Sequence, residues 1–459
     1  MMVRNLKIAA AVAAALATGS AFAGAGPSPA AAANPNVRLY VAGSSAAKNA
    51  VLGALESNLC GGTFSEFDST GNTNFFAVSC QPAASTGVSG ANGTNIFTIW
   101  YRDEGGSVVG ALPLVSGAQI NQLNIASAIS AGTKGTGSLY TAAVGGSSAT
   151  NGIDDSFSSN VFKAPVHLGI TDVEPGALIG NNYPTAYLPS VYGRATPAQL
   201  SGLTATTIFD QAFGIYVNTN SASFVAADKS GQGTATASLS LSAATIGAIL
   251  SGGLSDWSQV FDTSGNAVLT GSNTLPITIV NREQGSGSRT AVDIFFTGDE
   301  CAKSATPIVE STNGTADYFS TGNVLSAANG IPGAITYASI DNAGSSSNLT
   351  EVAVNGVQPN SLNEATDAYP VWFEATAVTG AGFGSLPANT QSLANYMISA
   401  FQTEATAPGS AQIDAIPGAS TNNASLPISG TSSTNGGKVI YINGYTRGGV
   451  SCNAPSPAI

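Results

Sequence analysis

Two stretches of the chain combine a strand end, glycine and serine residues, and the start of a helix. One is Val41-Ala42-Gly43-Ser44-Ser45, and the other is Arg282-Glu283-Gln284-Gly285-Ser286-Gly287-Ser288. Such a turn aims unpaired backbone N–H groups and the positive end of the helix dipole at one point. Serine hydroxyls add neutral donors, and Arg282 adds a planar fork suited to an oxyanion. The two stretches therefore predict anion-binding turns, although either one alone also fits a well-capped helix start.

Motifs of nucleophilic or metal catalysis are missing from the sequence. The one histidine, His167, lies in the apolar run Ala164 to Ile170 and is expected in the core. There is no GxSxG elbow, HExxH, Walker A, CxxC or acidic metal loop. We therefore expect a protein that is not an enzyme and that holds neither a metal nor another cofactor.

Composition narrows the class of partner. Of the 459 residues, 9% are charged, whereas a typical soluble domain has about 25%. The 14 basic and 26 acidic residues give a net charge of -12, with no basic stripe for a polyanion. Nucleic acid is therefore excluded as the main partner. A hydrophobic fraction of 43% argues against disorder and is ample for a core.

The N-terminus has the three parts of a secretory signal peptide. Arg4 and Lys7 precede an apolar stretch, Ile8 to Ala17, and Ala21-Phe22-Ala23 is a small-x-small cleavage site. We expect cleavage after Ala23, so that residues 1–23 leave a Pro/Ala-rich leader at 24–36. A membrane anchor is the alternative, but the stretch is short for a span. Cleavage removes two basic residues and changes the charge from -12 to -14. The mature chain would then be periplasmic or secreted, without a membrane span.

Four cysteines lie in the exported part, and an even number in an oxidising compartment favours two disulfides. Cys60 and Cys80 flank a hairpin-like stretch and are expected to pair with each other. Cys301 would then reach Cys452 near the C-terminus.

Strand-like runs alternate with helical patterns, which predicts βαβ units and an α/β fold. One helix should present Val51, Leu52, Leu55 and Leu59 on one face, and a second should cover Leu241 to Leu250. Two low-charge stretches, 131–160 and 408–437, are expected to be surface insertions. The expected strands are 37–41, 95–101, 165–170, 213–218, 276–281, 333–339, 351–354 and 438–443.

The order of these motifs resembles the periplasmic phosphate-binding proteins of ABC importers, in the type 2 periplasmic binding protein superfamily. ITIVNREQGSGSRTAVDIFF is similar to that family's R-x-D-G-S-G-T loop and the helix after it. Seven further segments follow the family's order between residues 37 and about 380: AGSSAAKNAV, YRDEGGSVVG, LGITDVEP, FGIYVNT, LSAATIGAILSGGLSDWSQV, GIPGAITYASI and AYPVWFEATAV.

The resemblance implies a two-lobed fold with a ligand cleft and two chain crossovers. Lobe 1 would take residues 37–208 and 345–459, and lobe 2 residues 209–344. It also implies a monomer that captures phosphate, or a related tetrahedral oxyanion, and delivers it to an importer complex in the membrane. The implied ligand-binding residues are Ser44, Ser45, Gly106, Ser107, Asp172, Arg282, Gly285, Ser286, Gly287 and Ser288.

Asp172 has a distinct chemical role among these ligand-binding residues. A buried carboxylate only accepts hydrogen bonds, so it favours an oxyanion that still carries a proton, as phosphate does and sulfate does not. A turn-forming role before Pro175 is the alternative. The chain also departs from the family pattern, with Glu283-Gln284 where Asp is usual and Ser288 where Thr is usual.

The carboxylates of Asp103 and Glu104, beside a ligand loop, could weaken an anion site or simply point to solvent.

Two functions other than anion binding stay open from the sequence. A secreted structural or adhesive protein could keep the fold without the ligand, with its polar insertions as the functional surface. A secreted enzyme acting on phosphate esters is the third reading, and the lack of metal ligands argues against it.

Overall fold

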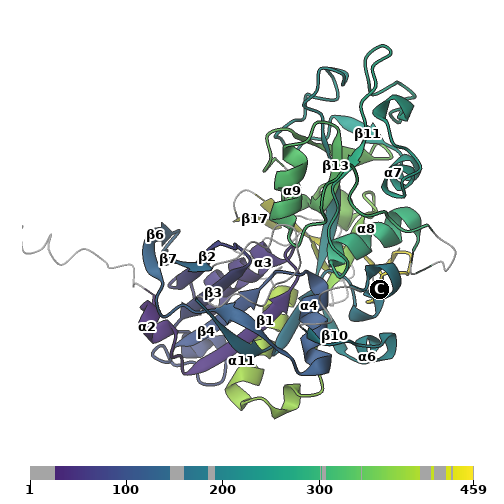
Figure 1. Ribbon diagram of the computed structural model, residues 1–459. Helices are drawn as coiled ribbons and strands as arrows, with labels where there is room; N and C mark the ends of the chain where they lie inside the picture. The colour runs from purple at the N-terminus through teal and green to yellow at the C-terminus, as the bar shows by residue number, and fades with distance from the viewer. Residues whose placement is uncertain are drawn as a thin grey trace, which may run out of the picture.

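The computed structural model describes residues 26–144, 160–184, 192–299, 301, 306–342, 344–403, 415–417, 431–435 and 438–457. The expected signal peptide, residues 1–23, lies outside them, as do parts of both expected insertions. Figure 1 shows two lobes, one built around β1 (Val37–Gly43) and the other around β13 (Ala334–Ser339). The α/β, two-lobed fold predicted from the sequence is confirmed.

The first lobe is built on a mixed sheet whose central strands are buried. β1 lies between β4 (Phe97–Arg102) and β9 (Leu168–Thr171) and is parallel to both. β3 (Phe75–Cys80) and β2 (Ser65–Gly71) continue the sheet beyond β4 in antiparallel pairing. Helices α4 (Ser107–Ser116) and α11 (Ala388–Thr403) pack on β1, which explains why that strand is apolar almost throughout.

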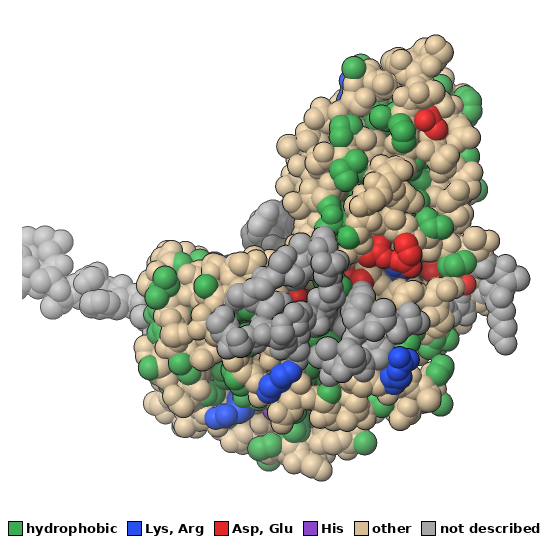
Figure 2. Space-filling model, viewed as in Figure 1, with side chains coloured by type: hydrophobic (Ala, Val, Ile, Leu, Met, Phe, Trp, Pro, Cys, Tyr) green, Lys and Arg blue, Asp and Glu red, His purple; other side chains and the backbone are tan. Residues whose placement is uncertain are grey.

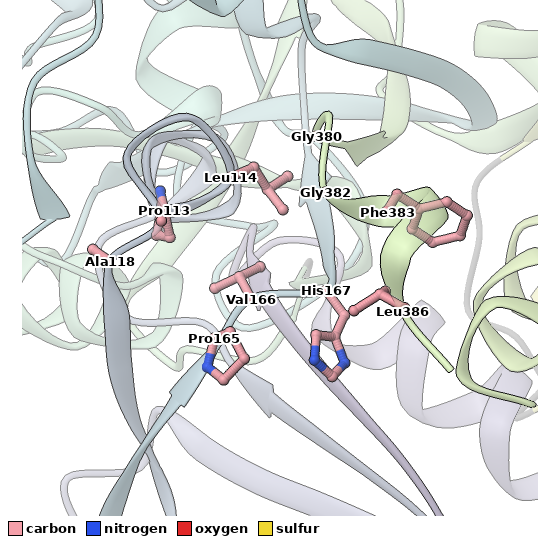
Figure 3. Close-up of a pocket in the computed structure, with 11 residues that line it drawn as sticks. Pro113, Leu114, Ala118, Pro165, Val166, His167, Gly380, Gly382, Phe383 and Leu386 are labelled. Carbon is pink, nitrogen blue, oxygen red and sulfur yellow. The ribbon is translucent and has the colours of Figure 1, made fainter. Parts of the chain in front are cut away.

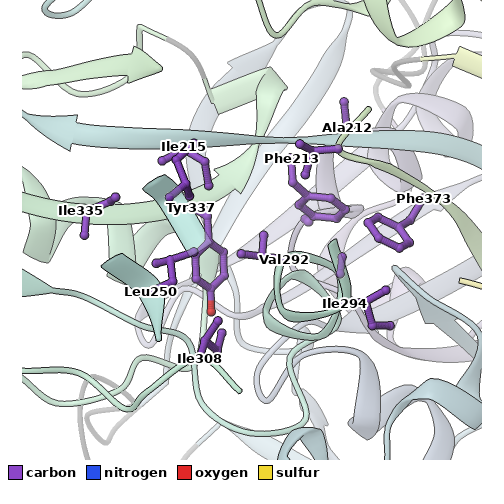
Figure 4. Close-up of a cluster of buried hydrophobic side chains, with 14 of the residues drawn as sticks. Ala212, Phe213, Ile215, Leu250, Val292, Ile294, Ile308, Ile335, Tyr337 and Phe373 are labelled. Atoms are coloured by element: carbon purple, nitrogen blue, oxygen red, sulfur yellow. The ribbon is translucent and has the colours of Figure 1, made fainter. Parts of the chain in front are cut away.

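One long strand, β10 (Thr204–Asn218), belongs to both lobes. Its first part pairs with β15 (Trp372–Thr379), and its last part with β13 and β14 (Leu349–Val354). Side chains around this crossing form one continuous apolar core. In Figure 4, Phe213 and Phe373 lie close to Val292 of α8 (Gly287–Thr297), with Tyr337 nearby. The lobe boundaries at 208/209 and 344/345 stay a prediction.

The other elements complete both lobes. Helix α3 (Lys48–Gly53) continues into a π-helical segment, Ala54–Leu59, and the two together bury the expected apolar face. The remaining helices are α2 (Pro29–Ala32), α6 (Pro197–Ser201), α7 (Ala243–Leu250), α9 (Thr321–Asn329) and α10 (Ser361–Ala365). The remaining strands are β5 (Gln119–Leu123), β6 (Ile129–Lys134), β7 (Gly137–Val144), β8 (Val161–Pro165), β11 (Leu239–Leu241), β12 (Thr278–Ile279), β16 (Ala415–Pro417), β17 (Thr431–Asn435), β18 (Lys438–Asn443), β19 (Tyr445–Thr446) and β20 (Ser456–Pro457).

Three details differ from the sequence prediction. The run 165–170 is not one strand, because β8 ends at Pro165 and pairs with β5, whereas β9 starts at Leu168 and joins the main sheet. The stretch 131–160 is not an irregular insertion throughout, since β6 and β7 form a hairpin that pairs with β2. The strand expected at 276–281 is regular only at Thr278–Ile279.

Both predicted disulfides are present. Cys60 pairs with Cys80 within the first lobe, at a sequence separation of 20. Cys301 pairs with Cys452 across a separation of 151. The second bond therefore ties the C-terminal segment to the loop that follows α8.

Candidate functional site

Residues from both lobes meet at the carboxyl group of Asp172. Ser44 follows β1 and donates its hydroxyl hydrogen bond to Asp172 Oδ1, while Ser288 in the first turn of α8 donates to Oδ2 at 3.2 Å. The backbone N–H of Asp172 donates to Ser107 Oγ at 3.0 Å. Ser44 and Asp172 lie together because β1 and β9 are parallel neighbours, so their carboxyl ends share one edge of the sheet.

Glycine makes the close approach at this sheet edge possible. Gly43 ends β1 with φ of 137°, and a methyl group added to it would lie 1.9 Å from the carbonyl oxygen of Ile170. No other residue type fits there without moving β9. The hydroxyl of Ser44 also accepts from the N–H of Ala47 at 3.1 Å, so the same side chain caps the turn into α3.

The starts of α4 and α8 face each other across the lobes. The N–H of Val108 donates to the carbonyl oxygen of Gly285 at 2.9 Å. A methyl group added at Gly106 would lie 2.8 Å from Ser286 Cα, and one added at Gly287 would lie 2.2 Å from Ser107 Oγ. The N-termini of these two helices, which are 10 and 11 residues long, therefore approach the same buried cluster.

Asp172 is buried in a mainly neutral setting. Only 2% of the residue is exposed. Burial raises the pKa of its carboxyl group, and the hydrogen bond from Ser44, the charge of Arg282 and the hydrogen bond from Ser288 oppose that effect. Tyr101 holds the turn from the other side, because its hydroxyl donates to the carbonyl oxygen of Ser44 at 2.5 Å.

Arg282 lies near this cluster without a hydrogen bond to Asp172. Its Nε and Nη2 donate to the carbonyl oxygens of Tyr318 and Phe319, each at 3.1 Å, and its Nη1 donates to Thr321 Oγ1 at 3.3 Å. Thr321 is linked in turn to Ser45, because the two hydroxyl oxygens are 3.1 Å apart. Arg282 and Ser45 are therefore connected through Thr321, a residue that the sequence analysis did not select.

The residue after the arginine is a buried carboxyl group as well. Glu283 is 1% exposed, and its Oε1 lies 3.7 Å from Arg282 Nη2. Burial raises the pKa of Glu283 to about 7, and the charge of the neighbouring Arg282 only partly opposes this effect. Glu283, which departs from the family pattern, thus adds a second buried carboxyl group, besides Asp172, and this one lies next to Arg282.

The acidic pair in the loop before α4 does not point to solvent, so that alternative is wrong. Glu104 is fully buried, and its Oε2 accepts from Arg102 Nη2 at 2.9 Å. Asp103 is 3% exposed, and burial raises its pKa to about 6. Acidic side chains also gather on the surface at the level where the lobes meet (Figure 2).

The ten predicted site residues thus fall into three groups. Ser44, Ser107, Asp172 and Ser288 form the central hydrogen-bonded cluster. Gly106, Gly285, Ser286 and Gly287 make the interlobe contact, with Ser286 Oγ accepting from Arg289 N–H as the cap of α8. Ser45 and Arg282 form the third group, joined by Thr321.

His167 is a core residue, as predicted, and lies away from the cluster. Its Nδ1 accepts from the N–H of Tyr40 at 3.4 Å. It also lines an apolar cavity of about 190 Å³, with Pro113, Val166, Phe383 and Leu386 among its neighbours (Figure 3). Burial lowers the pKa of His167 to about 4, so the imidazole is neutral at neutral pH.

Within the part of the chain that the structure describes, no group of three or more His, Cys, Asp or Glu side chains could hold a metal ion. A search of the same residues for a helix that is both long and apolar enough to cross a membrane also finds none.

A comparison with models of known protein families finds a match to the middle part of the chain. Residues 201–394, which run from the end of α6 into α11, match the PBP superfamily domain. The match includes the crossing strand β10, the Arg282–Ser288 loop and Thr321, so the resemblance to periplasmic binding proteins is confirmed at the level of the superfamily.

Solved structures give a more distant likeness, and no curated protein matches the chain. A proposed phosphate ABC transporter substrate-binding protein with bound phosphate, from Clostridium perfringens, is 14% identical, covering 81% of this chain and 97% of that one, with a TM-score of 0.44. A phosphate-binding protein from Stenotrophomonas maltophilia is 13% identical over 75% of this chain and 79% of that one, with a TM-score of 0.37. An ABC-type phosphate transport receptor from Vibrio cholerae is 15% identical over 50% and 73%, with a TM-score of 0.31.

Proposed function

We propose that this protein is an exported solute-binding protein that captures phosphate, or a related tetrahedral oxyanion, between its lobes. The observation that carries the proposal is the meeting of Ser44 and Ser288, from different lobes, on one buried carboxylate. A ligand at this point would be held by side chains of both lobes, and its binding would favour their closure.

The exchange of hydrogen bonds on binding is simple. In the closed cluster, Ser44 and Ser288 donate to Asp172. When the anion enters, these hydroxyls turn and donate to its oxygens, while Asp172 accepts the remaining proton of monohydrogen phosphate. Backbone N–H groups at the starts of α4 and α8 add neutral donors. The site thus needs no metal, and Arg282 supplies the nearby positive charge.

The superfamily match and the N-terminal sequence support a proposal for the biological setting. The signal peptide expected at residues 1–23 would deliver the mature chain to the periplasm or beyond it. There, the closed and loaded protein would deliver the anion to an importer complex in the membrane. We propose that binding and delivery, rather than catalysis, is the role of the site.

Titration calorimetry of the mature protein with phosphate and with sulfate tests the proposal. Phosphate should bind, and sulfate should bind more weakly at neutral pH because it brings no proton for Asp172. Ser288→Ala removes one donor and should weaken phosphate binding by about tenfold or more, while Ser385→Ala, at an exposed serine, should bind as the wild type does.

Asp172→Asn and Arg282→Ala test the two charged groups separately. Asp172→Asn should gain affinity for sulfate, because an amide can donate to an oxyanion without a proton. Arg282→Ala should weaken the binding of both anions. The absence of binding heat with either anion would refute the proposal and favour a structural or adhesive role.

A further inference from the structure

A polar cavity of about 190 Å³ lies between the lobes, next to the proposed anion site. One wall comes from the first lobe, around the start of α3 and the loops after β2 and β4. The opposite wall comes from the second lobe, at the start of α9 and the turn after β13. Among the lining residues, only Ala46 and Gly322 lack a polar side chain; the others are Ser45, Lys48, Asn49, Thr73, Asn74, Asp103, Ser320, Thr321, Asp341 and Asn342.

The cavity and the anion site share a boundary. Ser45 and Thr321 line the cavity and are hydrogen-bonded to each other across the lobes, with Thr321 N–H donating to Ser45 Oγ at 3.2 Å. Thr321 also accepts from Arg282, and Ser45 directly follows Ser44. A group bonded to an anion at the Ser44–Asp172 cluster would therefore enter the cavity past these two small side chains.

Asp103 is the unexplained group in this cavity. Its N–H donates to the carbonyl oxygen of Asn74 at 3.0 Å, but its Oδ1 is buried and has no hydrogen-bond partner. The residue as a whole is 3% exposed. Leaving a buried carboxylate oxygen without a donor is unfavourable. Asp103 also lines the cavity, so a rotation of its side chain would bring Oδ1 to a ligand there, and a donor from that ligand would remove the penalty.

The charges around the cavity define what kind of group fits. Lys48 would repel a ligand that carries an ammonium group, and Asp103 and Asp341 would repel a ligand that carries a second anionic group. The amide of Asn49 donates to Asp341 Oδ2 at 3.1 Å, so the two walls of the cavity are hydrogen-bonded to each other. Carboxylates accept, lysine donates, and amides and hydroxyls do both. This mixture matches hydroxyl groups, which donate and accept and carry no charge.

Size narrows the class further. A water molecule occupies about 30 Å³ in the liquid, so 190 Å³ holds about six groups of that size. Glycerol, with three carbon and three oxygen atoms, is of this size. A lining without aromatic side chains also offers no stacking surface to a larger sugar ring or to a base.

We propose that the ligand is the phosphate monoester of a small polyol, with its phosphoryl group at the Ser44–Asp172 cluster and its hydroxyl groups in the cavity lined by Asp103. This inference rests on the proposed function, because it needs the anion site. It extends that function, because inorganic phosphate alone would leave the cavity and Asp103 unused. The monoester would bind as its monoanion, because only that form carries a proton for Asp172. The second pKa of a phosphate monoester is about 6, so the test below is made at about pH 6.

Calorimetry with three probes tests the inference: inorganic phosphate, methyl phosphate and glycerol 3-phosphate. Glycerol 3-phosphate should bind at least about tenfold more tightly than methyl phosphate, because only its hydroxyls reach Asp103. Asp103→Asn should reduce this preference about tenfold and leave inorganic phosphate within about twofold. Asp228→Asn is the matched control, since Asp228 is also buried, also has a pKa raised to about 6 by burial, and does not line the cavity.

Asn49→Ala provides a second variant at an exposed position, in case Asp103→Asn fails to fold. It should also lower the preference for glycerol 3-phosphate over methyl phosphate. If inorganic phosphate binds but glycerol 3-phosphate binds no more tightly than methyl phosphate, the inference is wrong and the proposed function stands. If none of the three probes binds, the proposed function is wrong and the inference falls with it.

Discussion

Gly287→Ala should disable the interlobe cluster without unfolding the protein. Gly287 is the first residue of α8, and an added methyl group would lie 2.2 Å from Ser107 Oγ and 2.8 Å from Asp172 Cβ. Ordinary contact begins at 3.4 Å, so the gap to Ser107 must widen by about 1.2 Å. Rotating Ser107 away is no remedy, because its hydroxyl accepts from Asp172 N–H and Asp172 Cβ is fixed by the backbone.

The magnitude follows from the contacts that such a shift breaks. Moving α8 by this amount separates Ser288 from Asp172, now 3.2 Å apart, and disturbs the Ser107 contact. A hydrogen bond to a charged group contributes about 1.5–3 kcal/mol and a neutral one about 0.5–1.5 kcal/mol. The closed state should therefore lose about 2–4 kcal/mol, which lowers phosphate affinity by about 30-fold to several hundredfold.

Gly287→Ala should change the stability of the ligand-free protein much less than its affinity for phosphate, so the test compares these two quantities. Alanine favours a helix over glycine by about 1 kcal/mol, which offsets part of the strain within α8. Calorimetry should show weak phosphate binding, while thermal unfolding of the ligand-free variant stays close to wild type. Gly384→Ala is the control, because a methyl group there meets nothing within 4 Å. Wild-type phosphate affinity in Gly287→Ala would refute the view that this close approach belongs to the binding state.

Three further predictions concern charge and covalent links. Burial raises the pKa of Asp172, so sulfate affinity should increase as pH falls and the carboxyl group gains a proton to donate; calorimetry across a pH series should show this, and Asp172→Asn should abolish the dependence. Burial alone would raise the pKa of Glu310, but hydrogen bonds from Arg289 lower it to about 2. Glu310→Gln should therefore destabilise the protein at pH 7 in urea unfolding, with the difference from wild type fading as pH falls from about 4.5 toward 2; an equal difference at both ends would contradict it. Replacing Cys301 and Cys452 by serine opens a loop of separation 151 and should cost about 5 kcal/mol by chain entropy, against about 3 kcal/mol for the Cys60–Cys80 pair at separation 20; the reverse order in denaturant unfolding would show that strain or residual structure outweighs loop length.

Local sequence rules located most of the cluster. A strand that ends in glycine and serine before a helix is a pattern of adjacent residues, so Ser44 and Ser288 could be found without a structure. Part of this pattern, the serine and glycine residues at a helix start, is present at Ser320-Thr321-Gly322, where Ser320 caps α9. Thr321 was missed because no strand-like run directly precedes it, although an N-cap signal was there to be read.

Other features depend on contacts between segments far apart in the chain. The partners of Arg282 are carbonyl oxygens 36 and 37 residues away, which no spacing rule identifies. The burial of Asp103 and Glu104 could not be predicted either, since charged loop residues are usually exposed. Glu104 is buried because Arg102, two residues earlier on β4, pairs with it. The sheet is mixed rather than parallel because the crossing strand β10 is antiparallel to β15, β13 and β14, and because β3 is antiparallel to both β2 and β4. These pairings cannot be read from any single strand.

The acidic composition and the proposed anion site are compatible because they act over different distances. A net charge of -12 repels anions through long-range fields, which salt screens within about 10 Å. The cluster at Asp172 acts by contact, through serine hydroxyls and backbone N–H groups whose dipoles carry no net charge. Neutral donors also explain why a buried carboxylate can lie at the centre of such a site. The hydroxyls of Ser44 and Ser288 satisfy it when the ligand is absent, and the same hydroxyls can turn to an anion that brings its own proton to Asp172. A site built from arginine and lysine alone would bind any oxyanion, whereas a carboxylate among neutral donors selects by the proton.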